Sequence, residues 1–157
     1  MSTNKILFVD DEPNVRETIK ELLVFKNYEV QTAANGQEAL DILQYWMPDL
    51  IICDIVMPVM DGSELHENIK KNKFLILIPF IFLSAKNEID VIQNCLLDGA
   101  DDFLAKPFKI NELIFLISKR LQRIENNKNV PSNLLHSDKK KRLSQLKHSY
   151  LSNISYK

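Results

Sequence analysis

Residues 50–58 constrain this chain more than any other stretch. Their sequence is LIICDIVMP, so an apolar run leads directly into a carboxylate, Asp54. A short apolar run bounded by Pro48 and Pro58 predicts a strand buried on both faces, as in a parallel sheet. Because an unpaired charge is costly inside such a strand, we expect Asp54 at its carboxyl end, where open α/β sheets bind ligands. Alternatively, Asp54 caps the turn that follows.

Apolar runs and helical stripes alternate along the chain. Residues 5–9, 28–32, 80–83 and 102–105 predict four more strands, and the segments between them carry apolar residues at helical spacing. Five alternations predict an α/β fold, a doubly wound, five-stranded parallel sheet with helices on both faces. The helical stripes comprise Val15, Ile19, Leu22 and Leu23; Ala39, Leu40, Leu43 and Trp46; Leu65 and Ile69; Ile89, Ile92 and Leu96; and Ile110, Leu113, Ile114, Ile117, Leu121 and Ile124.

Polar residues stand at the ends of four of these strands. The first strand is followed by Asp10 and Asp11, the third ends in Asp54, the fourth in Ser84, and the fifth is followed by Lys106. In a doubly wound sheet these ends lie side by side, so residues distant in sequence should share one pocket. Each residue alone is more often a cap, a turn residue or a solvated side chain. Their joint placement is what points to a site.

Carboxylates, a hydroxyl and an ammonium at one site can together support phosphoryl transfer. Three neighbouring carboxylates repel one another unless a cation is bound, and Mg²⁺ prefers carboxylate, carbonyl and water oxygens. A carboxylate can also act as a nucleophile and form an aspartyl phosphate. Phosphoryl transfer then needs in-line positioning and neutralisation of charge, which Mg²⁺, an ammonium and a hydroxyl can supply. The residues therefore predict a phosphoryl-accepting aspartate with Mg²⁺ as cofactor.

Four motifs resemble the signature of response-regulator receiver domains. They are FVDDE at 8–12, DIVMPVMDG at 54–62, FLSA at 82–85 and GADDFLAKPF at 99–108, and the resemblance covers residues 4–124. It implies a flavodoxin-like (β/α)5 fold with strand order 2-1-3-4-5. It also implies a phosphoprotein of two-component phosphorelay signalling, a switch and not an enzyme.

The resemblance implies a role for each residue of the acidic pocket. Asp54 would accept the phosphoryl group from a histidine kinase or a phosphotransfer protein. Asp11, Asp54 and the backbone carbonyl of Val56 would bind Mg²⁺ directly, and Asp10 would act mostly through a metal-bound water. Lys106 would pair with the phosphoryl group.

The resemblance also implies a switch. Ser84 and Phe103 match the pair in which the hydroxyl moves to the phosphate while the ring turns inward, and the peptide bond before Pro107 would be cis. Ser84 replaces the commoner Thr, and Phe103 lacks the hydroxyl of the commoner Tyr. Val56 and Lys86 occupy the two positions that, in this family, flank the path of the hydrolytic water. We therefore expect slow self-dephosphorylation.

Two other functions compete with the signalling switch. An aspartate-nucleophile phosphatase of the haloacid dehalogenase type needs a second Asp two residues after the nucleophile, where this chain has Val56. A receiver used as a constitutive binding scaffold would not need intact acids and an intact Lys106. The Val56 found in place of a second Asp argues against the phosphatase, and the intact acids and Lys106 argue against the scaffold, so both favour the switch.

The composition changes after residue 124. Residues 125–136 predict a polar linker with Pro131, and residues 137–157 a basic amphipathic tail in which Leu143, Leu146, Tyr150 and Ile154 favour a helix. The tail resembles the start of a histidine-kinase dimerisation helix but stops before the acceptor His. It could therefore belong to a truncated receiver–kinase hybrid, pair as a coiled coil, touch nucleic acid or an acidic membrane, or stay solvated.

Partners and location follow from the same sequence. No helix-turn-helix, signal peptide or membrane-spanning run is visible, and Cys53 and Cys95 look like small core residues, so we expect a cytoplasmic protein without a DNA-binding domain. Phe115 lies off the core stripe of the last helix and Leu116 at its margin. The resemblance places output on the face made by the fourth helix, fifth strand and fifth helix. Phe115 is thus a candidate contact for a downstream protein or a homodimer, or a scattered surface residue.

Overall fold

The computed structural model describes residues 3–85, 88–97 and 99–127. The chain alternates strands and helices as the sequence predicts, with one added 3-10 turn, η1. The elements are β1 Lys5–Val9, α1 Pro13–Phe25, β2 Glu29–Ala33, α2 Gly36–Leu43, β3 Leu50–Asp54, α3 Gly62–Lys70, η1 Leu75–Leu77, β4 Phe80–Ser84, α4 Ile89–Leu97, β5 Asp102–Ala105 and α5 Ile110–Asn127.

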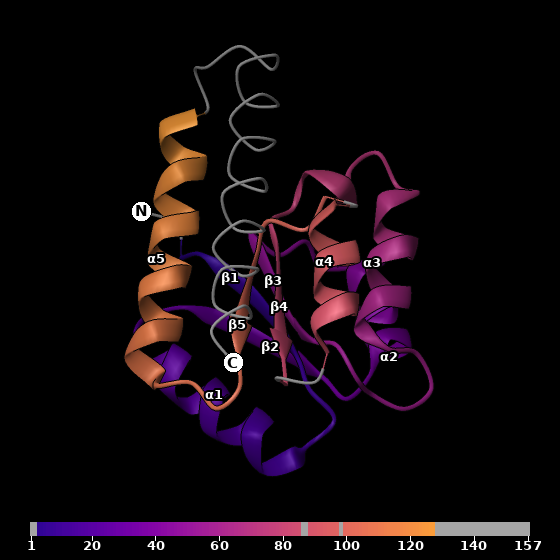
Figure 1. Cartoon of the computed structure of the whole chain (residues 1–157). Helices are drawn as coiled ribbons and strands as arrows, with labels where there is room; N and C mark the ends of the chain where they lie inside the picture. Colours follow the sequence, from indigo (N-terminus) through magenta and orange to yellow (C-terminus); the bar gives the residue numbers. More distant parts are fainter. Residues whose placement is uncertain (1–2, 86–87, 98, 128–157) are drawn as a thin grey trace, which may run out of the picture.

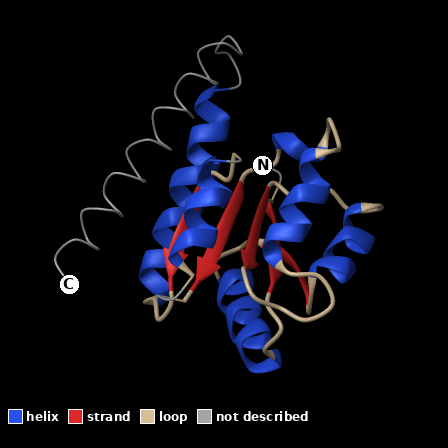
Figure 2. Cartoon of the chain, turned by 45° about the vertical axis from the view of Figure 1, so that its right-hand side comes forward, coloured by secondary structure: helices blue, strands red, loops and turns tan. Residues whose placement is uncertain are grey.

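The five strands form one parallel sheet in the order β2-β1-β3-β4-β5. This confirms the predicted doubly wound fold and its strand order. Figure 1 shows α1 and α5 on one side of the sheet and α2, α3 and α4 on the other, and Figure 2 shows the same three layers in a second view. All five strands point the same way, so their carboxyl ends meet at one edge.

Side-chain alternation divides the core into two layers. On the inner strands, Leu7 and Ile51 face the cluster beneath α2, α3 and α4, whereas Phe8 and Ile52 face the cluster beneath α1 and α5. Successive residues of a strand point to opposite faces, so a strand covered on both sides must be apolar throughout. Every residue of β3 is buried, which explains why its apolar run has no polar interruption before Asp54.

Helix starts follow from local capping chemistry. Pro13 occupies the first turn of α1, where a missing N–H costs nothing. Asn35 and Asp61 cap α2 and α3, because their side-chain oxygens accept hydrogen bonds from the backbone N–H groups of Glu38 and Glu64. These caps determine the residue at which each helix begins after the preceding strand and loop.

The bounds of four elements differ from those predicted, and β4 differs by one residue because it includes Ser84. β2 begins one residue later than predicted and ends at Ala33. α2 ends at Leu43, so Trp46 lies beyond the helix, although its half-buried ring still packs on the core. α5 continues to Asn127, three residues into the predicted linker 125–136, because no proline or glycine interrupts it before Pro131. The rest of that linker and the tail 137–157 lie outside the described residues.

Candidate functional site

Three carboxylates meet at the carboxyl edge of the sheet. Asp10 follows β1, Asp54 ends β3, and the pairing of Val9 with Cys53 makes these strand ends neighbours. One carboxylate oxygen from each of Asp10, Asp11 and Asp54 lies within 4.8 Å of the other two. Asp10 is fully buried, Asp54 is buried, and Asp11 is exposed to solvent. The predicted convergence of these acids is therefore what the structure shows.

Lys106 reaches this cluster from the loop after β5. Its Nζ donates hydrogen bonds to Asp54 Oδ2 at 2.9 Å and to Asp10 Oδ2 at 3.2 Å. The other oxygen of Asp54 accepts a hydrogen bond from the backbone N–H of Ile55 at 3.0 Å. A single ammonium thus bridges two carboxylates that would otherwise repel each other.

The environment raises the affinity of Asp54 for a proton. Burial raises the pKa of Asp54 to about 6, and the charges of Asp10 and Glu88 act in the same direction, while the hydrogen bond and charge of Lys106 act against it. Burial lowers the pKa of Lys106, but Asp54 and Asp10 outweigh that effect and the pKa is raised. At neutral pH the site therefore holds an ionised Asp54 facing a charged Lys106.

Ser84 brings an unused hydroxyl to the same edge. The residue ends β4 and is fully buried. Among the residues that the structure describes, no group forms a hydrogen bond with its Oγ. Leaving a buried hydroxyl without a partner costs free energy, and such groups in native proteins commonly await a ligand or a water. Ser84 can therefore donate to an oxygen that arrives at the site.

The structure places the other predicted residues in different parts of the domain. Phe103, in β5, is half-buried and packs against the core beneath α4. The Lys106–Pro107 peptide bond is cis, the isomer that the resemblance implied. The side chain of Val56 is exposed on the loop after β3, and the role of its carbonyl stays a prediction. Phe115 is 69% exposed on α5, well outside the pocket.

Two supporting residues were not predicted from the sequence. Arg16 of α1 donates from Nη1 to the backbone carbonyl of Asp10 at 2.8 Å, and the backbone N–H of Glu12 donates to Asp10 Oδ1 at 2.9 Å. A Cβ on Gly62 would overlap the backbone carbonyl oxygen of Asp54. The sequence did contain a signal for each residue. Arg16 is a cation one helical turn after the acidic residues, and Gly62 is a glycine at the first position of α3.

The donor set fits Mg²⁺. Three carboxylates offer hard oxygen ligands within reach of one ion, and the exposure of Asp11 leaves room for water ligands. A dication would also relieve the repulsion among these carboxylates, in addition to the charge of Lys106. Asp10, Asp11 and Asp54 are the residues that would hold it.

Comparison with known proteins agrees with this geometry. The family model described as response regulator receiver domain matches residues 6–118. The chain belongs to the response regulator receiver family. It is therefore a receiver domain of two-component signalling.

Curated relatives of this receiver domain are named as regulators. It is 39% identical over 126 residues to a probable transcriptional regulator, ycf27, of Cyanophora paradoxa, covering 80% of this chain and 52% of that protein. It is 38% identical over 124 residues to the nisin biosynthesis regulatory protein NisR of Lactococcus lactis subsp. lactis, covering 79% and 53%. The chain spans about half the length of the curated relatives that it matches. These relatives do not favour the truncated-kinase or scaffold alternatives.

Solved receiver domains share the fold. The signal receiver domain of a histidine kinase from Syntrophus aciditrophicus is 34% identical with a TM-score of 0.73, covering 83% of this chain and 96% of that one. The receiver domain of the sensor histidine kinase PA1611 from Pseudomonas aeruginosa PAO1 is 30% identical with a TM-score of 0.70, covering 77% and 99%. That structure is described with a magnesium ion coordinated in the active-site cleft. Within the described part of this receiver domain, no helix has the length and apolar character to cross a bilayer.

Proposed function

We propose that Asp54 accepts a phosphoryl group from a phosphohistidine of a histidine kinase or a phosphotransfer protein. The observation that carries this proposal is the position of Lys106, whose ammonium lies 2.9 Å from Asp54 in a cluster of three carboxylates. Such a group of charges is costly to assemble, and phosphoryl transfer is the chemistry that uses each member.

The transfer exchanges one bond to phosphorus for another. The ionised Asp54 carboxylate forms a P–O bond as the P–N bond of the phosphohistidine breaks, and the electron pair of that bond stays on the imidazole nitrogen. Mg²⁺, when bound, neutralises charge on the transferred oxygens. Lys106 moves from pairing with the carboxylate to pairing with the phosphoryl oxygens, and Ser84 Oγ–H donates to one of them.

Phosphorylation would then act on the switch pair. Once Ser84 is drawn to the phosphoryl group, the space beside β4 changes, and the half-buried ring of Phe103 on the paired strand β5 can turn further inward. We propose that this alters the face made by α4, β5 and α5, where Phe115 is exposed, and that the face contacts a downstream protein or a second copy. If Phe115→Asp leaves phosphorylation-dependent self-association unchanged, the dimer version is wrong.

Two further properties belong to this proposal. The apolar Val56, exposed two residues after Asp54, would disfavour a hydrolytic water, so the chain would catalyse its own dephosphorylation only slowly. A phosphoryl half-life of seconds in vitro would contradict this. Lys86, the other residue of this expectation, lies outside the described residues. The thiols of Cys53 and Cys95 are buried and not in a disulfide, which fits a reducing compartment and supports the cytoplasm as the site of action.

The direct test is phosphorylation by acetyl phosphate with Mg²⁺, read by intact mass. We expect the wild type to gain the mass of one phosphoryl group and Asp54→Asn to gain none. Asp41→Asn, at an exposed carboxylate of α2 that accepts a hydrogen bond from Gln37, is the matched control and should behave as the wild type. Phosphorylation of Asp54→Asn, or none of the wild type, would contradict the proposal.

A further inference from the structure

Large apolar side chains gather at the end of the domain opposite the phosphorylation site. Seven of the 13 exposed large hydrophobic residues in the described part of the chain are either the last residue of a helix or lie between a helix and the next strand. Because every helix runs antiparallel to the strands, these positions all fall at the amino-terminal edge of the sheet. We call this set the amino-end surface; it comprises Phe25, Tyr45, Met47, Phe74, Ile76, Leu77 and Leu97.

The turn η1 forms the most apolar part of the amino-end surface. Phe74 is 62% exposed and Leu77 is 79% exposed, while Leu75 between them is buried and anchors the turn. The side chain of Asn72 accepts hydrogen bonds from the backbone N–H groups of Phe74 and Leu75 at 2.9 and 3.0 Å. The turn is therefore held in one shape while it presents apolar side chains to solvent, an arrangement that typically marks a contact surface.

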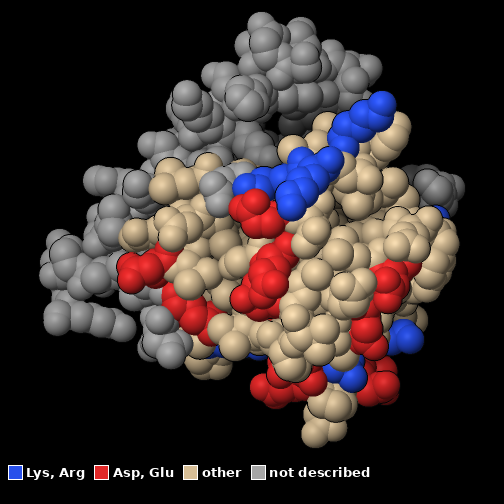
Figure 3. Space-filling view, turned by 90° about the vertical axis from the view of Figure 1, so that its right-hand side faces the viewer, with Lys and Arg blue, Asp and Glu red and all other residues tan. Residues whose placement is uncertain are grey.

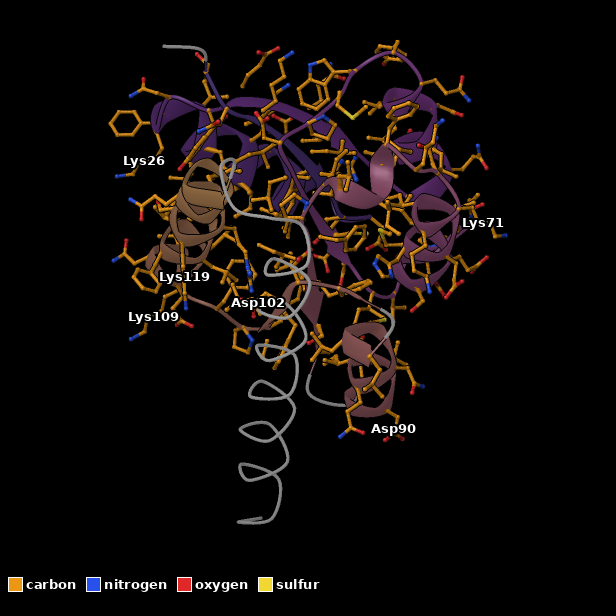
Figure 4. The ribbon with its side chains drawn as sticks, turned by 90° about the horizontal axis from the view of Figure 1, so that it is seen from above. Lys26, Lys71, Asp90, Asp102, Lys109 and Lys119 are labelled. Carbon is orange, nitrogen blue, oxygen red and sulfur yellow. The ribbon has the colours of Figure 1, made fainter. Side chains whose placement is uncertain are left out.

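Lysines lie beside several of these apolar residues, and the exposed carboxylates of Glu29 and Asp49 lie at the same edge of the sheet. Lys73 Nζ lies 5.2 Å from the ring centroid of Phe74, Lys71 is exposed one residue after α3, and Lys26 follows Phe25 at the end of α1. In Figure 4 the labelled Lys71 points away from the ribbon. Figure 3 shows that the basic side chains of the face it presents gather mainly near its upper edge, with the acidic ones below.

We propose that the amino-end surface binds an anionic lipid bilayer. Apolar side chains lie at four separate points of this edge, at the ends of α1, α2 and α4 and in η1, which suits a broad partner. Lysines beside them would meet anionic headgroups while Phe74 and Leu77 enter the boundary of the acyl chains.

Charge disfavours two other occupants of this surface. A second copy seated on η1 would bring Lys71 and Lys73 close to the same two lysines of its partner. The chain's own tail carries Lys139, Lys140, Lys141 and Arg142, which would be repelled in the same way. An anionic bilayer would attract both the lysines of the amino-end surface and the basic residues of the tail. Figure 1 shows that α5 ends at this same edge of the domain. Two groups of positive charge, each weak by itself, would then contribute to binding together.

The proposal is independent of phosphoryl transfer. Asp54 lies at the carboxyl end of β3, and the amino-end surface lies at the other end of the strands. Membrane binding and phosphorylation can therefore be measured separately, and each can fail without the other.

The experiment measures sedimentation of the full chain with large unilamellar vesicles. One set contains phosphatidylcholine with phosphatidylglycerol and the other phosphatidylcholine alone. We expect binding to the anionic vesicles, about fivefold weaker with each lysine removed, so Lys71→Gln and Lys73→Gln should each lower the partition coefficient by that factor. Lys109→Gln, at the start of α5 and the opposite end of the domain, is the matched control and should change it little.

The apolar contribution is tested with Phe74→Asp combined with Leu77→Asp. Both side chains are exposed, so the fold should tolerate the change, which the far-ultraviolet circular dichroism spectrum checks. We expect loss of vesicle binding, whereas Val91→Asp, an exposed apolar residue in the first turn of α4, should leave it intact. Trp46 is the single tryptophan of the chain and follows α2 at the same end, so its emission should shift on binding.

Each outcome decides the proposal. Binding to anionic vesicles that falls in the Phe74/Leu77 variant and not in the Val91 variant supports it. No binding to anionic vesicles, or binding that the Phe74/Leu77 change leaves intact, overturns it. If that change instead abolishes self-association in analytical ultracentrifugation while vesicles are not bound, the surface belongs to a second copy and the lipid assignment is wrong.

Discussion

The two ends of this sheet place their polar and apolar groups in opposite ways. At the carboxyl end, the carboxylates of Asp10 and Asp54 are buried with Lys106 between them. At the amino end, Phe74 and Leu77 stand in solvent beside lysines. Burying charge and exposing apolar surface both cost stability, so each end is better explained by a ligand than by folding.

The two ends also differ in the interactions that fix their side chains in place. The carboxyl end is made by residues at the ends of four strands, and Lys106 links Asp10 to Asp54 by hydrogen bonds. A change there should therefore alter both stability and chemistry. The amino-end surface consists of side chains on separate helix ends and turns with few mutual constraints. Substitutions should therefore have large effects at the first end and small effects on folding at the second.

The largest effect is expected where the backbone of the site is packed most tightly. Gly62→Ala would place a Cβ against the carbonyl oxygen of Asp54, which is backbone and cannot move aside. We expect a loss of about 3 kcal/mol in the free energy of unfolding, measured by urea denaturation. Gly36→Ala is the control, because its Cβ would meet the flexible side chain of Met60, and it should cost ~1 kcal/mol or less. Equal losses would refute this account of packing.

The next largest effect concerns chemistry at the same end. Lys106→Ala removes the only ammonium seen to contact both Asp10 and Asp54 in the described residues. We expect the rate of Mg²⁺-dependent phosphorylation by acetyl phosphate to fall about 100-fold, measured by intact mass over time. Lys109→Ala, three residues further along, should leave the rate unchanged. A Lys106→Ala rate within threefold of the wild type would contradict the role assigned to this side chain.

Metal binding at the carboxyl end should stabilise the folded protein. If Asp10, Asp11 and Asp54 hold Mg²⁺, MgCl₂ at ten times its Kd should add about 1.4 kcal/mol to the free energy of unfolding, because only the folded chain holds the site. The rise in Tm should disappear in Asp11→Asn, whose side chain is exposed, and persist in Asp49→Asn, an exposed carboxylate at the other end of the sheet. A rise that survives in Asp11→Asn would show that the ion binds elsewhere.

A smaller effect should depend on pH. The pKa of Asp54 is raised from 3.8 to about 6, so between these pH values the folded protein keeps a proton that the unfolded chain has released. This carboxyl therefore contributes stability below pH 3.8 that is lost as pH rises through about 6. Without metal, we expect Asp54→Asn to exceed the wild type in stability by ~1 kcal/mol at pH 7.5, a figure reduced for solvent screening, and to match it near pH 4.

The measurement is urea denaturation at the two pH values in the presence of a chelator. Asp41→Asn should show no such difference, since that carboxylate is exposed. An Asp54→Asn variant less stable than the wild type at pH 7.5 would mean that its bond with Lys106 outweighs the cost of burial.

The smallest effect is expected at the amino end. Leu77→Asp replaces a side chain that is 79% exposed, so the free energy of unfolding should change by no more than about 0.5 kcal/mol. Phosphorylation by acetyl phosphate should be unaffected, because this residue is remote from Asp54 along the strands. A loss of several kcal/mol would show that Leu77 packs within the folded domain, and the contrast between the two ends would fail.

Much of the fold followed from local patterns. The fully apolar runs of β1, β3 and β4 required cover on both faces, and the helical stripes supplied it. The acids, hydroxyl and lysine could be placed at one edge because each follows a strand in a parallel sheet. The end of α2 before Trp46 was missed, because helical spacing continues past Leu43 in the sequence although the helix does not. The role of Arg16 was missed because it depends on a contact with a backbone carbonyl.

The sequence alone determined the order of the strands' polar ends and the residue types that meet there, since periodicity and strand polarity are local properties. Only the tertiary structure decided that one ammonium bridges Asp10 and Asp54, that Ser84 has an unused hydroxyl, and that the residues around η1 face solvent. Distances and burial depend on how distant segments pack, and a pattern within one segment does not contain that information.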